Sequence, residues 1–410
     1  MRKRIFDIIY NYINKNTFLN LVLKNEKENV NKIALMVYGV IEKKLYLEFL
    51  VDKTVNRKID KKTKIILMMA IYEKLFLERD NYVVFNEYIE LTKKVNKRAQ
   101  KYVTYYLHNL MPNKFIMPNF DDELLNESIF LSVPIYPLSL LKDQYPDFYI
   151  ELINTKKRNY VRKIRELNKP EDFINFEFED LFYTNNSVVQ TQDFKEGNVI
   201  IQDFGSYLVT MFVNPQKNDK ILDLCAAPGN KTMHMHKFCS NITANEINEK
   251  RYELMKKNFQ KNNCEITTIN IDATDKEKMK ETFKNKKFNK ILLDVPCSGL
   301  GVIASKPEIR YNINKDDLEK LINTQKMIFD NAFDLLEKDG EIIYSTCSLN
   351  EKENEEQINY FCEKYNLKII KDNYLEKYMM EVDEGYKLLP FDFQSDGFFM
   401  TKLKKKEIYE

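Results

Sequence analysis

The chain has 410 residues, which is long for a single compact domain, and 44% of them are hydrophobic, enough to build a substantial core. Its 64 lysines and arginines almost balance its 62 aspartates and glutamates, so any binding to nucleic acid has to come from local clusters of basic residues. The scarcity of glycine and proline, 9 and 11 residues, excludes collagen-like and low-complexity chains.

Cysteines and apolar runs indicate the cellular environment. The six cysteines stand singly along the chain, whereas disulfide frameworks and structural zinc sites need close pairs. We therefore expect reduced thiols and no metal. No run approaches the roughly 20 apolar residues that span a bilayer, and Asp7 and Asn11 interrupt the stretch after the basic start, so no signal peptide is evident. The expectation is a cytoplasmic protein without membrane contact.

The first part of the chain has the pattern of helices. Gly39 is the only glycine among the first 196 residues. Apolar side chains within residues 33–41 follow the spacing of one helical face, residues 63–77 are apolar nearly all round, and residues 86–110 show a third helical pattern with basic residues at exposed positions. These patterns predict an all-helical domain over residues 1–130.

A proline-rich connector and a basic segment follow. Four prolines lie between residues 112 and 137, which indicates a break in regular structure. Residues 156–165 then hold six basic side chains in ten positions, with a tyrosine among them. Such a run is either a solvated helix face or a contact surface for the RNA backbone, and both interpretations stay open. We assign residues 131–190 to a linker and a small basic subdomain, whose candidate RNA contacts are Lys156, Lys157, Arg158, Arg162 and Lys163.

Over residues 191–410, short apolar runs alternate with helical stretches. Five of these runs are expected to be parallel strands: residues 220–224, 241–244, 265–269, 290–293 and 341–344. Helical patterns over residues 246–261 and 315–337 separate them, and this alternation predicts a doubly wound α/β sheet. Residues 386–389 and 397–403 lack a helix between them and predict an antiparallel hairpin at one end of the sheet.

In a sheet of this kind, ligands bind beyond the carboxyl ends of the strands. The turn after the first predicted strand holds Gly229 alone, so it lacks the three glycines of a nicotinamide site, and no earlier glycine completes a phosphate-binding loop. A tight turn after Asp223 suits a compact ligand with an amino acid tail, such as S-adenosylmethionine. Glu246, after the second strand, is placed to accept from the ribose hydroxyls, and Asp272, after the third, from the adenine amino group. One such acid alone is more often a helix cap, but three in register favour a cofactor site.

Two cysteines follow neighbouring strands of the same predicted sheet. Cys297 lies in the turn after the fourth strand and Cys347 in the turn after the fifth. A cysteine in an apolar run is usually a small buried hydrophobic residue. Both of these lie just past the strands, in turns that carry serine, threonine or glycine. We therefore expect them at the same edge of the sheet, close to the cofactor turn.

The motifs around these residues resemble those of the Nol/Nop/Sun family of RNA cytosine-C5 methyltransferases. The resemblance covers residues 222–232, 293–301 and 344–348 and extends to 199–203 and 396–399. The helical first third is similar to the NusB-like domain that precedes the catalytic unit in bacterial small-subunit rRNA methyltransferases. The resemblance implies an all-α NusB-like N-terminal domain followed by a Rossmann-like, class I methyltransferase domain that binds S-adenosylmethionine. It also implies 16S rRNA as the partner, and we expect a monomer.

The family pattern assigns roles to individual residues. Carbon 5 of cytosine is too weak a nucleophile to take a methyl group directly, and covalent addition of a thiolate at carbon 6 activates it. By resemblance, Cys347 is that nucleophile, Cys297 assists release of the product, and Asp294 contacts the cytosine edge. The implied cofactor contacts are Cys225, Ala226, Ala227, Pro228, Gly229, Asn230, Lys231, Glu246, Asp272 and Asp294.

One position departs from the family, which usually has glycine where this chain has Asn230. Asparagine is the non-glycine residue best able to adopt a positive φ, so we expect the turn to form, and its effect on cofactor affinity stays open. Lys306 and Arg310, which follow the Cys297 turn, are further candidates for phosphate contacts.

Three alternatives remain at this point. The same chemistry could serve tRNA or 23S rRNA. The chain could instead be a non-catalytic NusB-type RNA-binding or antitermination factor, although it retains both cysteines and all the strand-end acids. A DNA cytosine methyltransferase would usually place its nucleophile in the turn after the fourth strand, which predicts an essential Cys297 and a dispensable Cys347.

Overall fold

The structure, a computed structural model, describes residues 1–15, 19–24, 26, 28–55, 57–185, 187–284 and 286–406. In this described part the chain forms two compact units. The first, called here the helical unit, comprises residues 1–142 together with Lys306–Asn312, and the second, the sheet unit, comprises the rest. The helical unit thus extends past residue 130 and includes a short segment from the second half of the sequence.

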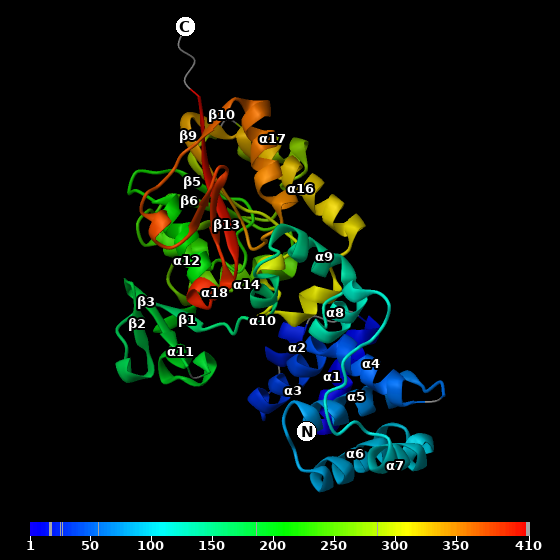
Figure 1. The fold of residues 1–410 in the computed structure, drawn as a ribbon. Coiled ribbons are helices and arrows are strands. Elements are labelled where there is room, and N and C mark those ends of the chain that lie inside the picture. Colours follow the sequence, from blue (N-terminus) through cyan, green and yellow to red (C-terminus); the bar gives the residue numbers. More distant parts are fainter. Residues whose placement is uncertain are drawn as a thin grey trace. The chain divides into compact units, whose positions relative to one another are not determined.

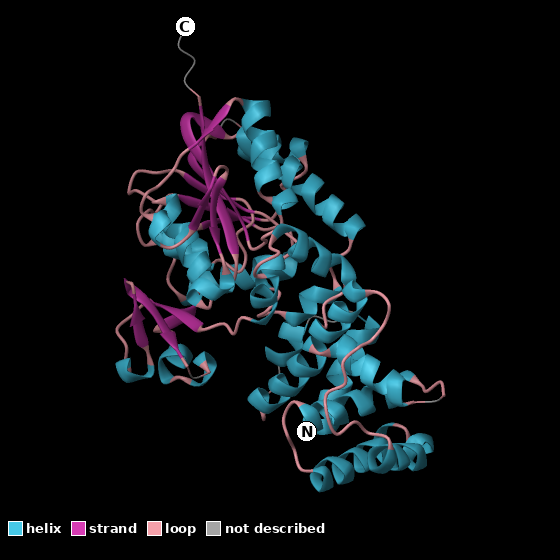
Figure 2. Cartoon of the chain, viewed as in Figure 1, coloured by secondary structure: helices cyan, strands magenta, loops and turns pink. Residues whose placement is uncertain are grey.

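The helical unit holds helices and loops and no strand among its described residues (Figure 2). Its helices are α1 (Arg2–Lys15), α2 (Leu19–Lys24), α3 (Val30–Glu42), α4 (Lys44–Thr54), α5 (Lys61–Leu75), α6 (Asn81–Val95), α7 (Gln100–Asn109), α8 (Glu123–Leu131) and most of α9 (Ile135–Gln144) (Figure 1). Helix α5 is buried on nearly all sides, as its apolar sequence predicts. The all-helical prediction for this region is confirmed.

The prediction of a single helix over residues 86–110 is wrong. Helix α6 ends at Val95, and the short helix η1 (Lys97–Ala99) separates it from α7. Asn96 stands at this break, where its side-chain amide donates to Asp60 and Thr63 at the start of α5, at 2.9 and 3.1 Å. A side chain that bonds outside its own helix favours a helix end, and the spacing of apolar residues does not reveal such a contact.

The segment Lys306–Asn312 packs inside the helical unit, mostly as the short helix η5 (Pro307–Tyr311). Arg310 is only 1% exposed, and its guanidinium donates to the carbonyl oxygens of Glu42 and Leu131, both at 3.4 Å. These carbonyls stand at the ends of α3 and α8, where backbone acceptors lack partners inside the helix. The phosphate contact expected for Arg310 is therefore wrong, because its guanidinium is buried on backbone carbonyls.

In the sheet unit, the basic segment contributes to a small antiparallel sheet. Its strands are β1 (Asn159–Lys163), β2 (Ile174–Phe176), β3 (Phe178–Thr184) and β4 (Val199–Ile201), in the order β2-β3-β1-β4. Helix α11 (Gln192–Glu196) contacts β4, whereas α10 (Tyr149–Asn154) contacts the short helix α18 (Pro390–Phe393). Because residues 159–163 form an inner strand, the interpretation of the basic run as a solvated helix face is wrong.

The main sheet follows the predicted alternation. Its strands are β5 (Ile221–Asp223), β6 (Ile242–Asn245), β7 (Thr267–Ile269), β8 (Phe288–Asp294), β9 (Leu336–Thr346), β10 (Leu367–Ile369), β11 (Met380–Val382), β12 (Gly385–Leu388) and β13 (Phe398–Lys405). They lie in the order β11-β12-β13-β9-β8-β5-β6-β7, and β10 pairs with β13. Strands β5 to β9 pair in parallel, which confirms the doubly wound prediction. The predicted antiparallel pair is β12 and β13, although the short helix α18 (Pro390–Phe393) lies between them in the chain.

Helices cover both faces of this sheet (Figure 1). They are α12 (Phe204–Val213), α13 (Asn230–His236), α14 (Glu249–Lys261), α15 (Lys276–Phe283), α16 (Lys315–Phe333) and α17 (Glu355–Tyr365). Ile221 and Leu292 pack with α12 on one face, whereas Leu222 and Leu293 pack with α15, α16 and α17 on the other. Burial on both faces explains the continuous apolar runs of the parallel strands.

Among the described residues, no single helix is long and apolar enough to cross a membrane. The pair α8 and α9, which is sharply bent between the two helices, meets the length and composition only when both are taken together.

Candidate active site

The candidate site lies where the strand order of the main sheet reverses. Strand β5 stands between β6 and β8. The chain continues from β5 to β6 and β7 on one side and then crosses to β8 and β9 on the other side. The crevice at such a reversal, beyond the carboxyl ends of the strands, is the usual ligand site of an α/β sheet. Asn245, at the end of β6, holds neighbouring strand ends together, because its amide donates to the carbonyl oxygens of Leu224 and Ile271 at 3.0 and 3.1 Å. Sequence reasoning did not single out this residue.

The turn after β5 is built around Gly229. Its φ is +97°, which side chains disfavour, and a Cβ there would lie 2.5 Å from the ring of Phe259. Asn230 begins α13 with a negative φ, so the expectation of a positive φ at this residue is wrong. Its side-chain amide instead donates to the carbonyl oxygen of Ile201 at 2.9 Å. Asn230 thereby ties the turn to the end of β4.

Asp223 ends β5 with one carboxylate oxygen unsatisfied. The residue is 1% exposed, and Oδ2 accepts from Thr232 at 2.8 Å, whereas Oδ1 has no hydrogen-bond partner among the described residues. Burial raises the pKa of this carboxyl to about 7. The residue lines a cavity of about 90 Å³ that also touches Cys225, Lys231 and Asp294. Because a buried acceptor without a donor costs free energy, the cavity suits a ligand that brings a donor, such as an ammonium group.

Glu246 and Asp272 follow β6 and β7 at the same edge of the sheet. Oε1 of Glu246 accepts from the backbone N–H of Asn248 at 2.9 Å, and Oε2 lies 3.5 Å from Nη1 of Arg251. Oδ1 of Asp272 accepts from the backbone N–H and the hydroxyl of Thr274, at 2.8 and 2.7 Å. Each carboxylate stabilises its own turn. The fold thus brings these predicted cofactor residues to one edge and leaves their ligand contacts as expectations.

Asp294, at the end of β8, is held by two neighbours. Oδ1 accepts from the hydroxyl of Ser345 at 2.9 Å, and Oδ2 accepts from Nζ of Lys231 at 2.7 Å. Burial alone would lower the pKa of Lys231, but the charge of Asp294 raises that pKa above its usual value, with smaller contributions from Asp223 and Cys347. Lys231 therefore remains a cation between the cofactor turn and the cysteine turns.

Cys297 and Cys347 lie in adjacent turns with their Sγ atoms 3.3 Å apart. Both are free thiols and partly exposed. The hydrogen bond with Cys347, followed by burial, raises the pKa of Cys297 well above that of an ordinary thiol. Two negative sulfurs at this distance repel each other, so ionisation of one thiol keeps the other protonated. The pair can supply one nucleophilic sulfur and one protonated thiol.

Backbone contacts fix the two cysteine turns against each other. The N–H of Gly301 donates to the carbonyl oxygen of Cys347 at 3.0 Å, and the N–H of Gly397 donates to the carbonyl oxygen of Gly301 at 2.7 Å. A Cβ on Gly301 would stand 2.3 Å from the carbonyl oxygen of Gly397. This close approach requires glycine at position 301.

Glu353, which sequence reasoning missed, joins the same turns through its side chain. It is fully buried at the end of η6 (Glu351–Glu353), and Oε1 accepts from the backbone N–H of Ser298 at 2.7 Å. Oε2 accepts from the hydroxyls of Ser298 and Ser348, at 2.5 and 2.7 Å, and Gln325 adds a donor at 3.2 Å from Oε1. The two serines directly follow the two cysteines. In the sequence, Glu353 stands in an acidic cluster typical of an exposed helix start, so no signal pointed to it.

Two family models match the chain. Residues 210–404 match the family described as 16S rRNA methyltransferase RsmB/F, and residues 1–104 match the NusB family. The chain joins a NusB-family domain to an RsmB/F-family methyltransferase domain. The resemblance based on the motifs is therefore confirmed, and the RsmB/F match contains the cofactor turn and both cysteine turns.

Two relatives match over nearly the whole chain. A probable ribosomal RNA small subunit methyltransferase B of Bacillus subtilis is 29% identical over 95% of this chain and 94% of its own length. The ribosomal RNA small subunit methyltransferase B of Proteus mirabilis is 26% identical over 90% of this chain and 89% of its own length.

Solved structures share the fold. The crystal structure of PH0851 matches with a TM-score of 0.77 at 21% identity, covering 98% of both chains. The structure of NSun6 from Pyrococcus horikoshii with SFG matches with a TM-score of 0.58 at 16% identity, covering 67% of this chain and 99% of that one.

The predicted RNA contacts of this RsmB/F-type chain differ in their surroundings. Lys157 pairs with two carboxylates: its Nζ lies 2.8 Å from Oδ2 of Asp203 and also bonds Asp396. Lys157 is therefore half-buried and paired, and its contact with RNA stays a prediction. The remaining candidates on the surface or half-buried are Lys156, Arg158, Lys163 and Lys306.

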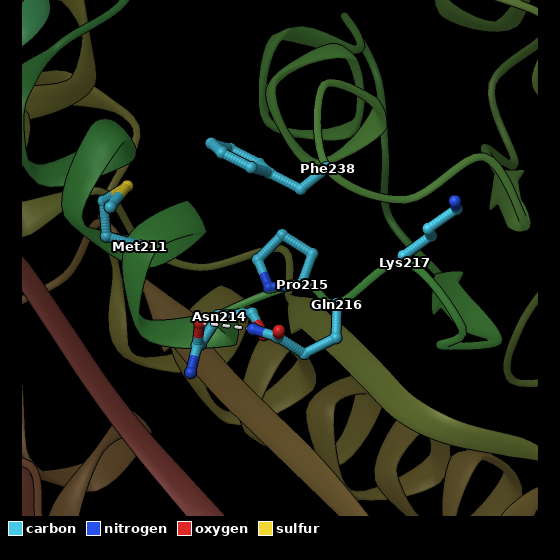
Figure 3. Close-up of a pocket in the computed structure, with 6 residues that line it drawn as sticks. All are labelled: Met211, Asn214, Pro215, Gln216, Lys217 and Phe238. Carbon is cyan, nitrogen blue, oxygen red and sulfur yellow. Dashed lines mark hydrogen bonds between the residues drawn. The ribbon is translucent and has the colours of Figure 1, made fainter.

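A hollow of about 250 Å³ after α12 is not part of the candidate site (Figure 3). Met211, Pro215 and Phe238 form apolar walls, and the side chain of Lys217 extends away from Met211. None of its lining residues is an acid, a thiol or a histidine, so it lacks groups for acid–base or nucleophilic chemistry. Nor do the described residues contain a group of three or more histidine, cysteine or acidic side chains that could hold a metal ion.

Proposed function

We propose that this protein transfers a methyl group from S-adenosylmethionine to carbon 5 of a specific cytosine in 16S rRNA, through a covalent bond between Cys347 and the base. The observation that carries the proposal is the pair of thiols, Cys297 and Cys347, with Sγ atoms 3.3 Å apart beside Asp294 and Lys231. A nitrogen or oxygen acceptor is itself nucleophilic, whereas carbon 5 of cytosine needs covalent activation.

The residues after β5 fit S-adenosylmethionine. Oδ1 of Asp223 offers an acceptor for the ammonium of its methionine part, and the turn over residues 225–231 lines the same cavity. Glu246 would hold the ribose and Asp272 the adenine side. The NSun6 structure that shares this fold contains SFG. Bound here, S-adenosylmethionine supplies a methyl group carried on a sulfonium.

Cys347 begins the reaction as a thiolate. Lys231, kept positive by Asp294, stabilises the negative sulfur, and the thiol of Cys297 lies within hydrogen-bond distance of it. The thiolate adds to carbon 6 of the cytosine and forms an S–C bond, which makes the electron pair of the 5,6 double bond available at carbon 5. Asp294 contacts the base at N3, and a proton taken up from solvent and held between N3 and the carboxylate balances the developing charge.

Once carbon 5 carries the methyl group, its proton has to leave. The S–C bond removes the charge from the sulfur of Cys347, so the main cause of the raised pKa of Cys297 disappears at this stage. Cys297 loses its proton to solvent and, as a thiolate, accepts the proton from carbon 5. The electron pair of that C–H bond restores the 5,6 double bond, the S–C bond breaks, and Cys347 leaves as a thiolate.

The choice of 16S rRNA is supported by the RsmB/F match and by the curated relatives, which are described as small subunit methyltransferases. The target cytosine has to be unstacked before a sulfur can reach carbon 6. We assign the surrounding RNA to the NusB-family domain and to the exposed basic residues Lys156 and Lys306, as an electrostatic contact that weakens with salt.

Labelled methyl transfer tests the substrate. Purified protein should transfer label from S-adenosylmethionine to 16S rRNA, offered as naked RNA and as assembled small subunits, and the product should map to 5-methylcytosine at one position. Label on tRNA or 23S rRNA instead would overturn the choice of substrate. RNA binding without any transfer would favour the NusB-type binding factor.

Variants of the two cysteines test the chemistry. Cys297→Ala should trap the covalent RNA adduct, visible as a slowed band on a denaturing gel, because the proton of carbon 5 is not removed. Cys347→Ala should give no adduct. The opposite pattern would reverse the two roles, as the DNA-type alternative predicts.

A further inference from the structure

Arg162 lies in a positively charged pocket of the sheet unit, separate from the cysteine turns. The pocket has a volume of about 270 Å³ and is lined by residues of β1, the end of α13 and the loop after α14. Its basic lining residues are Arg162, Lys163, His236 and Lys237, and its one acid is Asp180. Nothing in the proposed methyl transfer uses these side chains.

The guanidinium of Arg162 forms no ion pair among the described residues, and the acid nearest to it in charge effect is Asp180 of the same pocket. The residue is 3% exposed, and Nε donates to Oε1 of Gln202 at 2.7 Å, but no described carboxylate forms an ion pair with it. Burial lowers the pKa of Arg162 to about 10, although the charge of Asp180 acts in the opposite direction. Arg2, which is paired with Glu73, shows the opposite direction, a raised pKa. Because a buried guanidinium without an ion pair is costly, the pocket is suited to receive an anion.

The single acid of the pocket is already engaged. One oxygen of Asp180 accepts from the hydroxyl of Tyr207 at 2.6 Å, and the other pairs with Nζ of Lys237 at 3.0 Å. Among the described residues, the ion-pair partner of Lys163 is Glu166, at 3.5 Å, and Glu166 is 95% exposed, so this pair contributes little. The charges of Arg162 and Lys163 thus remain available to a ligand.

The buried histidine of α13, His234, carries no charge. His234 is fully buried, and both its ring nitrogens lack partners among the described residues. Burial, followed by the charge of Arg162, lowers the pKa of His234 well below its usual value, so the ring stays neutral. Neutrality of His234 leaves the positive potential of the pocket intact.

We propose that this pocket binds a phosphate group of the RNA backbone, an inference that rests on the proposed function. A phosphate brings a full negative charge and several acceptor oxygens, which match the planar donors of a guanidinium. Helix α13 runs from the cofactor turn to this pocket, a length of roughly 10 Å at about 1.5 Å per residue. The bound phosphate therefore belongs to a nucleotide outside the cysteine site and orients the RNA strand.

RNA binding by the full chain tests the pocket. Lys163→Ala combined with Lys237→Ala should weaken binding to naked 16S rRNA about tenfold, because the pocket loses the charge of Lys163 and Lys237 no longer neutralises the carboxylate of Asp180. The slope of log affinity against log salt should also fall by roughly 0.7 to 0.9. The matched control is Lys217→Ala, an exposed lysine of the same unit that lines the hollow of Figure 3.

Arg162→Gln should weaken binding further, and where this buried variant does not fold, the lysine pair decides the question. Affinity and salt slope equal to those of Lys217→Ala would overturn the proposal. Inorganic phosphate, added at constant ionic strength, should raise the Tm of the wild type and not that of the lysine pair. Inorganic phosphate could raise the Tm of the wild type while the variant with both lysines replaced binds RNA normally. This result would also overturn the proposal, since the pocket would then bind a phosphate that does not belong to the RNA.

These measurements do not depend on catalysis. A wild-type protein that binds RNA through the pocket but transfers no label would count against the proposed methyl transfer alone.

Discussion

Two buried carboxylates, one in each unit, show how structural and ligand-binding acids differ. Glu73 in α5 is 3% exposed, and both its oxygens are bonded: Oε1 by Arg2 and Tyr88, each at 2.9 Å, and Oε2 by Arg2 at 2.7 Å. Asp223 at the end of β5 is equally buried, yet Oδ1 has no partner among the described residues. A fully bonded carboxylate completes the core, whereas a spare buried acceptor indicates a place for a ligand.

The same comparison separates other residues. Both oxygens of Glu353 are occupied by donors from the cysteine turns, so this residue resembles the structural Glu73. Arg162 resembles Asp223 in this respect, because its buried guanidinium forms no ion pair with a described carboxylate. Satisfaction of hydrogen bonds distinguishes these residues better than burial does, because all of them are buried.

The largest effect is expected at the nucleophile. Cys347→Ala should lower methyl transfer by roughly a thousandfold or more, because the proposed mechanism assigns the bond to carbon 6 to this sulfur alone. The unfolding free energy should change by less than about 1 kcal/mol, since the side chain is partly exposed. Cys362→Ala, in α17, is the control and should keep its activity. Transfer by Cys347→Ala above a tenth of the wild-type rate would contradict the covalent step.

A stability measurement tests the assignment of Glu73 as a purely structural acid. Glu73→Gln should lower the free energy of unfolding by about 3 kcal/mol, because it leaves the charge of Arg2 without its buried partner. The exposed Glu87, which also pairs with Arg2, keeps the loss from being larger. In denaturant unfolding, Arg2→Met added to Glu73→Gln should recover part of the loss. An unchanged free energy of unfolding in Glu73→Gln would contradict the structural role of Glu73.

Glu353→Gln should lower kcat about 10- to 100-fold with little change in KM for RNA, because the two thiols lose their alignment. Its charge is one cause of the raised pKa of Cys297, so the variant should move the thiol limb of the pH–rate profile to lower pH. Glu351→Gln, an exposed neighbour, is the control. A lower kcat with an unchanged pH profile would mean that Glu353 only stabilises the fold.

The smallest effect concerns cofactor binding by Asp223. Its folded pKa of about 7 lies above the ordinary value of 3.8, so ionisation destabilises the ligand-free protein progressively as pH rises between these values. Affinity for S-adenosylmethionine should rise with pH through about 7, because the ionised carboxylate accepts from the ammonium.

Calorimetric titration of Asp223→Asn between pH 6 and 8 checks this. Affinity should be about tenfold lower at pH 8 and nearly independent of pH. An affinity that still rises through pH 7 in the variant would assign the titration to another group.

Much of the fold was predictable from local patterns. The apolar runs of the parallel strands and the nearly all-apolar α5 matched the structure because full burial leaves a direct trace in composition. The helix break at Asn96 and the strand within residues 156–165 were missed, since both depend on partners far away in the chain. Arg310 was misassigned for the same reason, because a basic residue on its own does not show whether it is buried.

The order of the elements, the cofactor turn and the two cysteine turns can be predicted from residues that lie close together in the chain. Which polar atoms are left without a partner depends on contacts between distant residues, and these become visible in the folded protein. The sulfur–sulfur distance, the buried Glu353 between the two turns and the unpaired guanidinium of Arg162 all join residues distant in sequence. Hydrogen-bond satisfaction is a property of three-dimensional neighbours, and the spacing of residues along a chain does not contain it.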